Sequence, residues 1–154
     1  MARGVLIVDV ADETVVELSP TDWVQAQTSK ILETGTTEGI EVLGSPIVLL
    51  TLRGAKSGTL RYTPVMRVEH DGSYAVVASK GGAPEHPVWY HNIKAHPEFP
   101  LQDGTETKTY VAREADGEER AAWWERAVKA FPSYAEYQTK TVRQIPVFVL
   151  DPKS

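Results

Sequence analysis

Hydrophobic residues along the chain fall into runs of strand length, and their pattern predicts a sheet. The longest run, PIVLLTL at 46–52, is apolar and β-branched, which is typical of a strand buried on both faces. Alternating runs follow and are expected to pair through Asp-Gly turns, 60–70 with 73–79 and 99–102 with 105–114. A final apolar run, PVFVL, occupies 146–150. We therefore expect antiparallel hairpins around a buried central strand.

Helix signals interrupt this strand pattern near the N-terminus. Ser19, Pro20 and Asp22 supply a capping hydroxyl, a proline at the first helical position and an acid near the positive end of the helix dipole. The helix should run from about Pro20 to Thr34, where Gly35 ends it. Its inner face is expected to carry Trp23, Val24, Ile31 and Leu32.

A second helix is predicted from 116 to about 130. Asp116 and Glu119 have the spacing of a capping box, and the apolar residues recur as one stripe of Ala121, Trp124, Val128 and Phe131. A second short helix is expected after the break at Pro132. Residues 5–18 mix β-branched and acidic residues and fit either a strand or a loose arm.

Hairpins with helices between them define an α+β protein around an antiparallel sheet, and such a sheet can close into a small barrel. The 154 residues fit a single domain, 1–154, with no internal repeat. We expect an N-terminal arm and helix at 1–40, followed by the sheet region at 44–152.

Composition narrows the chemistry. The formal charge of -5 argues against nucleic acid as a partner, because its binders display a basic face. The absence of cysteine excludes thiolate nucleophiles, disulfides and thiolate metal sites. The N-terminal segment lacks a signal-peptide pattern, and no run reaches the roughly 18 apolar residues of a membrane span. We expect a cytoplasmic protein, with peripheral membrane contact as the alternative.

The segment TLRGAKSGTLRYTP, at 51–64, is basic within an acidic chain. Gly54 and Gly58 allow a sharp turn with exposed N–H groups, and charge and a hydroxyl come from Arg53, Lys56, Ser57 and Arg61. Together they describe a cradle for a phosphate or a carboxylate. The spacing is not that of a P-loop, and the segment joins two strands. The alternative is a solvated basic hairpin loop.

A second glycine segment, ASKGGAPEHPVWYHN at 78–92, also favours an anion. It begins where a strand ends, passes through two glycines and enters a helix near Pro87, with Ser79 and Lys80 at its rim. The alternative is a tight turn followed by core packing of Trp89.

Histidines recur every five residues, at His86, His91 and His96. Five residues turn a helix by about 140° net, so adjacent members cannot share a face as a pair of zinc ligands does. We therefore predict no metal site.

The segment FPSYAEYQTKT would place Phe131, Tyr134 and Tyr137 on one helical face as an aromatic wall with two hydroxyls. Such a wall can line a pocket, and the alternative is ordinary core packing.

Three segments in order, LLTLRGAKSGTLRYTPV, VVASKGGAPEHPVWYHNIKAHPE and FPSYAEYQTKTVRQIPVFVLDP, resemble the deazaflavin-dependent nitroreductase family, reductases that use reduced coenzyme F420. The resemblance covers about 44–152, and it makes this region the cofactor-binding part of the chain. It implies a split β-barrel, FMN-binding-like, with flanking helices.

The resemblance also implies site residues. The cofactor would be bound by Lys56, Ser57, Arg61, Pro64, Ala78, Ser79, Lys80, Gly81, Gly82 and Trp89. Lys56 and Arg61 would hold its phosphate and acidic tail, and the acceptor pocket would comprise Met66, Phe131, Tyr134 and Tyr137. Tyr134 or Ser79 would act as the catalytic donor to the acceptor oxygen. Members of the family have tyrosine where this chain has Phe131 and Met66, so a flat apolar acceptor is favoured.

The resemblance thus implies an F420H2-dependent reductase that transfers a hydride to a small electrophile, a quinone, a nitro compound or an activated alkene. Protonation would come from Tyr134 or from water. The alternatives are an FMN- or haem-binding protein on the same barrel, a non-catalytic deazaflavin carrier, and a small module whose basic loop meets an acidic partner. The physiological acceptor and the oligomeric state stay open.

Overall fold

The structure is a computed structural model that describes residues 6–8, 15–17, 22–42 and 44–153. In chain order its elements are β1 (Leu6–Val8), β2 (Val15–Glu17), α1 (Asp22–Thr34), β3 (Glu41–Val42), β4 (Ser45–Arg53), β5 (Leu60–Met66), β6 (Glu69–His70), β7 (Ser73–Val77), the 3-10 helix η1 (Lys80–Gly82), α2 (Val88–Ala95), β8 (Glu98–Asp103), β9 (Glu106–Glu114), α3 (Gly117–Ala130), α4 (Ser133–Thr139) and β10 (Val147–Pro152).

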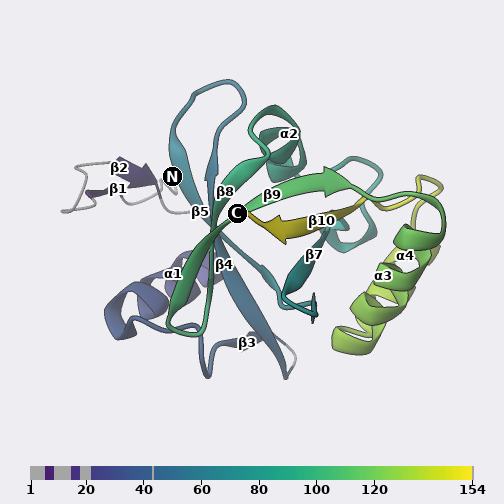
Figure 1. The fold of residues 1–154 in the computed structure, drawn as a ribbon, viewed down its shortest axis with the longest axis horizontal. Coiled ribbons are helices and arrows are strands. Elements are labelled where there is room, and N and C mark those ends of the chain that lie inside the picture. The colour runs from purple at the N-terminus through teal and green to yellow at the C-terminus, as the bar shows by residue number, and fades with distance from the viewer. Residues whose placement is uncertain (1–5, 9–14, 18–21, 43, 154) are drawn as a thin grey trace.

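The strands form one sheet in the order β1-β2-β5-β4-β8-β9-β10-β7-β6, with β3 beside β4. Pairing is antiparallel except between β2 and β5, which run parallel. Figure 1 shows α1 on one side of this sheet and the pair α3 and α4 on the other, with β1 and β2 projecting at the edge of β5. The fold is therefore α+β, as the pattern predicted. The hydrogen-bonded order begins at β1 and ends at β6, so the sheet is not closed.

Strand β4 is buried on both faces, as its continuous apolar run predicted. Val48, Leu50 and Leu52 point into a cluster shared with residues of β7, β8, β9 and β10. Ile47 and Leu49 point the other way and pack against α1. This alternation makes β4 the centre of the molecule, because it joins two cores.

One of the two predicted hairpins forms and the other is largely wrong. β8 and β9 pair across the Asp103-Gly104 turn as expected. The Asp71-Gly72 turn joins only β6 and β7, whereas β5 pairs with β4, and β7 pairs with β10. The chain leaves the β5 ladder at Arg67, whose N–H donates to the Pro46 carbonyl at 3.0 Å. Long-range burial therefore overrides the local hairpin.

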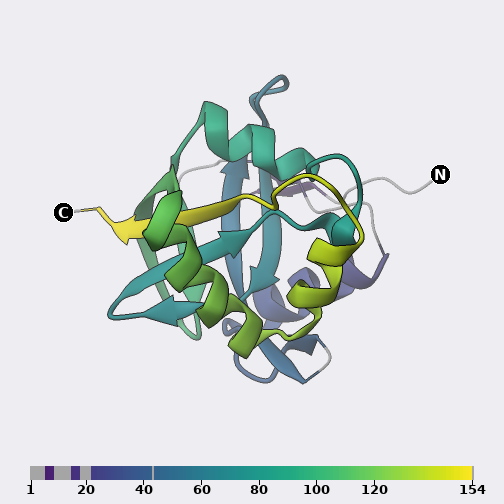
Figure 2. The ribbon, with the colours of Figure 1, turned by 90° about the vertical axis from the view of Figure 1, so that its right-hand side faces the viewer.

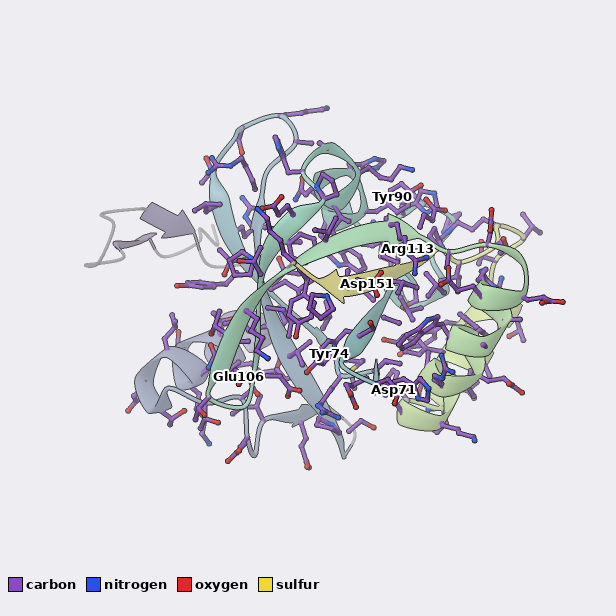
Figure 3. All side chains as sticks on the ribbon, viewed as in Figure 1. Asp71, Tyr74, Tyr90, Glu106, Arg113 and Asp151 are labelled. Carbon is purple, nitrogen blue, oxygen red and sulfur yellow. The ribbon has the colours of Figure 1, made fainter. Side chains whose placement is uncertain are left out.

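The predicted capping box of α3 is wrong. Asp116 lies at the N-cap, but its side chain makes no capping hydrogen bond. The Glu119 carboxylate instead accepts from Arg113 Nη2 at 2.8 Å. Arg113 on β9 also donates to Asp151 on β10, and Figure 3 shows the two side chains side by side. Glu119, the acid that a capping box would need, is therefore paired with Arg113 instead.

The predicted apolar stripe of α3 is confirmed in part, because Phe131 is buried in the core cluster against which Trp124 and Val128 pack. Trp123 and Ala127 are buried, Ala121 is exposed, and Trp124 and Val128 are half-buried. The pair of adjacent tryptophans allows either register in the sequence. In the structure Trp123 is the more deeply buried of the two, one turn before the buried Ala127, and Trp124 packs against the same cluster.

Helix α1 ends at Thr34, and the Gly35 N–H donates to the Ile31 carbonyl at 2.7 Å, as predicted for a glycine stop. Ile31 is buried, and Leu32 is half-buried. The predicted start at 19–20 and the side chains of Trp23 and Val24 lie outside the described residues. The short helix after Pro132 and the final strand are confirmed as α4 and β10.

Candidate functional site

The basic segment forms the loop between β4 and β5, and its own backbone closes it. Gly54 N–H donates to the Thr59 carbonyl at 2.8 Å, and Gly58 N–H donates to the Gly54 carbonyl at 3.0 Å. Gly58 has φ +71°, a left-handed conformation that glycine adopts without steric cost. The glycines therefore have the turn-forming role that the sequence predicted.

Two amides of this loop have no hydrogen-bond partner in the described part of the chain. The N–H of Thr59 donates to Ser57 Oγ at 3.2 Å, and the N–H of Ala55 donates to Asn92 Oδ1 at 2.9 Å. Within the described residues, no hydrogen bond engages the N–H groups of Lys56 and Ser57, whose side chains are exposed. Two adjacent amides of this kind beside a lysine are able to bind an anion.

Arg53 has a structural role in the loop. Its Nη1 donates to the Gly58 carbonyl at 2.6 Å. The side chain also lines a hollow of about 470 Å³ with Leu60, His96 and Pro100. None of the residues that the family resemblance assigns to the cofactor or the acceptor lines this hollow.

The second glycine segment forms η1, directly after β7. Lys80 has φ +46° and Gly82 has φ +85°, so the chain makes a left-handed turn at both ends of η1. The N–H groups of Ser79 and Lys80 have no acceptor among the described residues. Ser79 is 7% exposed, and its hydroxyl is also without a hydrogen bond. Lys80 Nζ pairs with Glu85 Oε1 at 2.9 Å.

The guanidinium of Arg143 binds this loop from the segment between α4 and β10. It donates to the carbonyls of Ala78 at 3.2 Å, Ser79 at 2.9 Å and Ala83 at 3.0 Å. Its Nη1 also lies 3.0 Å from His86 Nδ1. One side chain therefore spans the loop from before η1 to after it.

The four predicted pocket residues meet in one cluster. Phe131 and Tyr134 are buried in it, and Met66 and Tyr137 pack against it. The ring centroids of Phe131 and Tyr134 are 5.1 Å apart, and those of Tyr134 and Tyr137 are 6.2 Å apart. The structure thus gathers residues from β5, α3 and α4, and the aromatic residues join the core while leaving hydroxyls unpaired.

Tyr134 has the environment of a neutral donor. The residue is 5% exposed, yet its hydroxyl makes no hydrogen bond with the described residues. Burial raises the pKa of Tyr134 well above that of a free phenol, and the nearby Tyr137 adds to the rise. The hydroxyl therefore keeps its proton at neutral pH.

Helix α4 packs directly against η1. A Cβ added to Gly82 would lie 2.5 Å from the Tyr137 carbonyl oxygen, so only glycine allows this approach. Figure 2 shows η1 in teal beside α4 in yellow-green. The aromatic cluster and the second glycine loop are therefore neighbours in space.

Alternation along β5 separates two of the predicted cofactor residues. Arg61 shares a face with Val65, which packs against the cluster of β4, β7 and β10. Pro64 shares the opposite face with Tyr62 and Met66, which pack against the α1 side, and Met66 also packs against the aromatic cluster. Among the described residues, positions 63–66 of β5 pair only with β4, so this stretch has one unpaired edge. A ligand at that edge could touch both faces of the strand.

Trp89 and Ala78 contribute to packing. Trp89 is half-buried on α2 and lies with Tyr90 against the core cluster of β4, β7 and β10. Ala78 is fully buried, and its N–H donates to the Pro146 carbonyl at 2.9 Å. A contact of either side chain with a cofactor stays a prediction.

Asn92 and Arg143 are the residues whose part in the loops sequence reasoning missed. Each holds a loop that lies far from it in the chain, 37 residues for Asn92 and up to 65 for Arg143. The signal in the sequence was that both residues lie within the segments that carry the family resemblance. Neither residue type identifies its partner, because the partners are backbone atoms.

No group of three or more metal-ligating side chains occurs among the described residues. His86 stacks on Tyr90 with centroids 4.1 Å apart, and Tyr90 is labelled on α2 in Figure 3. Within the described part of the chain, no helix is long and apolar enough to span a membrane.

An α+β fold with unpaired amides in two glycine loops, beside an aromatic cluster, has the features of a protein that binds an anionic small molecule. Residues 23–152 match the family model described as F420H(2)-dependent quinone reductase. An F420H(2)-dependent quinone reductase of Mycobacterium tuberculosis is 35% identical over 108 residues, which are 68% of this chain and 72% of that protein. The chain therefore belongs to the F420H(2)-dependent quinone reductase family.

Solved structures agree with this assignment. One described as an F420-H2 dependent reductase is 59% identical, covers 73% of this chain and all of its own, and has a TM-score of 0.66. Another, described as a domain-swapped dimer, is 60% identical, covers 86% of this chain and all of its own, and has a TM-score of 0.68. The haem storage protein HutZ of Vibrio cholerae, at 15% identity and a TM-score of 0.55, shares the fold alone. The protein is an oxidoreductase that uses reduced coenzyme F420 as its hydride donor.

Proposed function

We propose that the protein transfers a hydride from reduced F420 to a quinone bound against the aromatic cluster, on a fold of the split β-barrel type. The observation that carries this is the close packing of η1 against α4, since a Cβ added to Gly82 would lie only 2.5 Å from the Tyr137 carbonyl oxygen. A cofactor held at η1 would therefore lie beside the wall that receives the acceptor.

The two glycine loops fit an anionic cofactor. The free amides of Lys56 and Ser57 and the side chains of Lys56 and Arg61 would hold the phosphate and the acidic tail. The free amides of Ser79 and Lys80 would bind the polar edge of the ring. Four N–H groups without a partner among the described residues, on two loops, suit an anionic ligand that accepts hydrogen bonds.

The acceptor pocket would consist of Met66, Phe131, Tyr134 and Tyr137. Of these, Met66 and Phe131 offer no hydroxyl, so the wall is mainly apolar with donors at the two tyrosines. A flat quinone can bury its ring there and direct a carbonyl oxygen at a hydroxyl. Nitro compounds and activated alkenes are acceptors of the same electrophilic class.

Reduced F420, when bound, supplies the hydride, so the protein needs no nucleophile of its own. The chain binds the donor at two loops and places the acceptor against the cluster. Tyr134 donates a hydrogen bond to the acceptor oxygen, where negative charge grows, and one well-placed donor of this kind is typically worth about 3 kcal/mol. Because the pKa of Tyr134 is raised, the hydroxyl is in its donating form throughout the neutral range.

The test is to mix the protein anaerobically with reduced F420 and menadione and to follow oxidised F420 by its fluorescence. We expect turnover that needs both the protein and menadione. A control without protein measures the direct reaction of the two compounds.

Other outcomes select the other hypotheses. Tight F420 binding without turnover of a quinone, a nitro compound or an alkene would identify a carrier. Stoichiometric FMN or haem in the purified protein would show that the fold serves another cofactor. Failure to bind F420 at physiological salt would contradict the assignment of both loops.

A further inference from the structure

We propose that Arg143 is a positioning residue for the cofactor loop: its guanidinium holds the backbone of residues 78–83 in the shape that turns free amides toward the ligand. The inference rests on the proposed function, since it assigns that loop to F420. It adds a residue to which the family resemblance attached no role.

One guanidinium serves both ends of η1. Nη1 and Nη2 donate to the Ala78 and Ser79 carbonyls before η1, and Nε donates to the Ala83 carbonyl after it. The planar fork of arginine can satisfy acceptors that diverge in this way, whereas the point charge of lysine cannot. The contacts are with carbonyl oxygens, so the guanidinium organises the loop directly.

The loop needs an external restraint because of its backbone. Lys80 has φ +46°, a left-handed conformation that a residue with a Cβ seldom adopts. Such conformations persist where surrounding contacts impose them, and they cluster at ligand sites. The carbonyls that Arg143 binds flank Lys80 on both sides, so the strained residue lies inside the clamped segment.

Arg143 is itself held by α4, the helix that carries Tyr134 of the proposed acceptor pocket. Gln138, on α4, donates through Nε2 to the Arg143 carbonyl at 2.8 Å and accepts from the Ile145 N–H at 3.1 Å. The helix that carries Tyr134 therefore also supports the residue that shapes the cofactor loop. The clamp sets where cofactor and acceptor meet.

His86 completes the clamp and makes it sensitive to acid. Nη1 of Arg143 donates to His86 Nδ1 at 3.0 Å, which requires a neutral imidazole with its proton on Nε2. The groups that face His86 are the stacked Tyr90, His91 and Glu114, besides Arg143. Burial, then the charges of Arg143 and His91, lower the pKa of His86, and Glu114 opposes them.

Acidification should break the hydrogen bond between Arg143 and His86. Because the folded pKa of His86 lies below its ordinary value of 6.5, the contact contributes fully above about pH 6.5. It is lost as the pH falls through the folded pKa, because protonation removes the acceptor and sets two cations together. F420 affinity should therefore weaken on acidification.

The test compares wild type with Arg143→Lys, which keeps the positive charge but lacks the planar guanidinium with its several N–H donors. We expect the F420 dissociation constant to rise about tenfold, as for one to two lost hydrogen bonds. In the cofactor-free protein, amide hydrogen exchange in 78–86 should quicken while exchange in β4 and β10 stays as in wild type. The affinity loss should persist at high salt, since it comes from geometry.

Two further variants keep the test decisive if Arg143→Lys folds poorly. Gln138→Ala, which leaves the guanidinium in place, should quicken exchange in 78–86 to a smaller extent. His86→Asn, whose Oδ1 can replace Nδ1 as an acceptor, should bind F420 like wild type at neutral pH and lose the acid-induced weakening.

Unchanged F420 affinity and unchanged local exchange in Arg143→Lys would overturn the proposal. So would faster exchange spread over the whole sheet, which would show a general loss of stability. A wild type that does not bind F420 would defeat the proposed function, whereas the exchange comparison, which needs no cofactor, would still decide whether Arg143 shapes the loop.

Discussion

The amide N–H of Ala55 donates to Oδ1 of Asn92 at 2.9 Å, and this bond ties the basic loop to helix α2. Asn92 is buried, so the bond is shielded from water and its loss would leave a buried acceptor site without a partner. The neighbouring amides of Lys56 and Ser57 are the free ones. Asn92 therefore sets the orientation of the proposed anion cradle without contacting the anion.

Replacing Asn92 by Ala should loosen the loop and raise the F420 dissociation constant about tenfold, as expected for one buried hydrogen bond. Asn92→Asp is the matched variant, since it keeps an acceptor oxygen and adds a negative charge. Its loss of affinity should shrink as salt is added, whereas that of Asn92→Ala should not. Titration of F420 fluorescence at two salt concentrations measures both, and identical salt responses would contradict the distinction.

Replacing Lys56 and Arg61 together by Ala should weaken F420 binding by about threefold to tenfold per charge at low ionic strength, with kcat nearly unchanged. Added salt should weaken binding in wild type more than in the double variant, because the variant has fewer charges to screen. Lys108→Ala is the control, since Lys108 is an exposed cation on β9 that pairs with Glu106. Equal affinity of wild type and double variant at low salt would remove these residues from the cradle.

Tyr134→Phe should lower kcat/KM for menadione about 100-fold and leave the F420 dissociation constant unchanged, because it removes one donor to the developing oxyanion. In wild type, kcat/KM should show no titration of Tyr134 between about pH 6 and 9, since its pKa is raised. Tyr137→Phe serves as the comparison on the same helix. If Tyr134→Phe reduces every acceptor at the wild-type rate, water or another group is the donor.

Phe131→Tyr should change acceptor preference by adding a hydroxyl to the cluster. Phe131 is buried against Tyr134 and Tyr137, so the new group would enter the proposed pocket. We expect the ratio of kcat/KM for a nitroimidazole to that for menadione to rise. An unchanged ratio would show that the hydroxyl count of the pocket does not set acceptor preference.

Gly82→Ala should cost roughly 2–4 kcal/mol of unfolding free energy, because a left-handed φ and a backbone clash act together. Gly58→Ala, also at a left-handed φ but with open space at its Cβ, should cost about 1 kcal/mol. Urea denaturation of the two variants compares strain with and without the clash. Equal losses of unfolding free energy in the two variants would mean that η1 and α4 can move apart to accept the added methyl group.

Much of the local structure could be predicted from residue pattern. The continuous run at 46–52 predicts a strand buried on both faces, because only such a strand can be apolar throughout, and β4 is one. Pro132 and Gly35 predict where helices stop, because each acts on the backbone within one turn. These signals are local, and they were confirmed.

The register of α3 and the pairing partners of β5 and β7 could not be predicted, because the local sequence allows more than one arrangement. Two adjacent tryptophans allow two registers for α3, and in the structure Trp123 is buried while Trp124 is half-buried against the same core. The Asp71-Gly72 turn allows a long hairpin, yet β7 pairs with β10 and β5 pairs with β4, both distant in the sequence from the turn. Such decisions depend on surfaces that exist only once the distant strand is in place.

The sequence by itself determined the residue types of the site: glycines that permit left-handed turns, cations beside them, and an aromatic helix face that begins after Pro132. Tertiary structure alone decided which amides remain free, that Asn92 and Arg143 hold the loops, and that η1 lies against α4. The physical reason is that backbone carbonyls and amides carry no sequence signature. Their partners are chosen by the fold, after the side chains have packed.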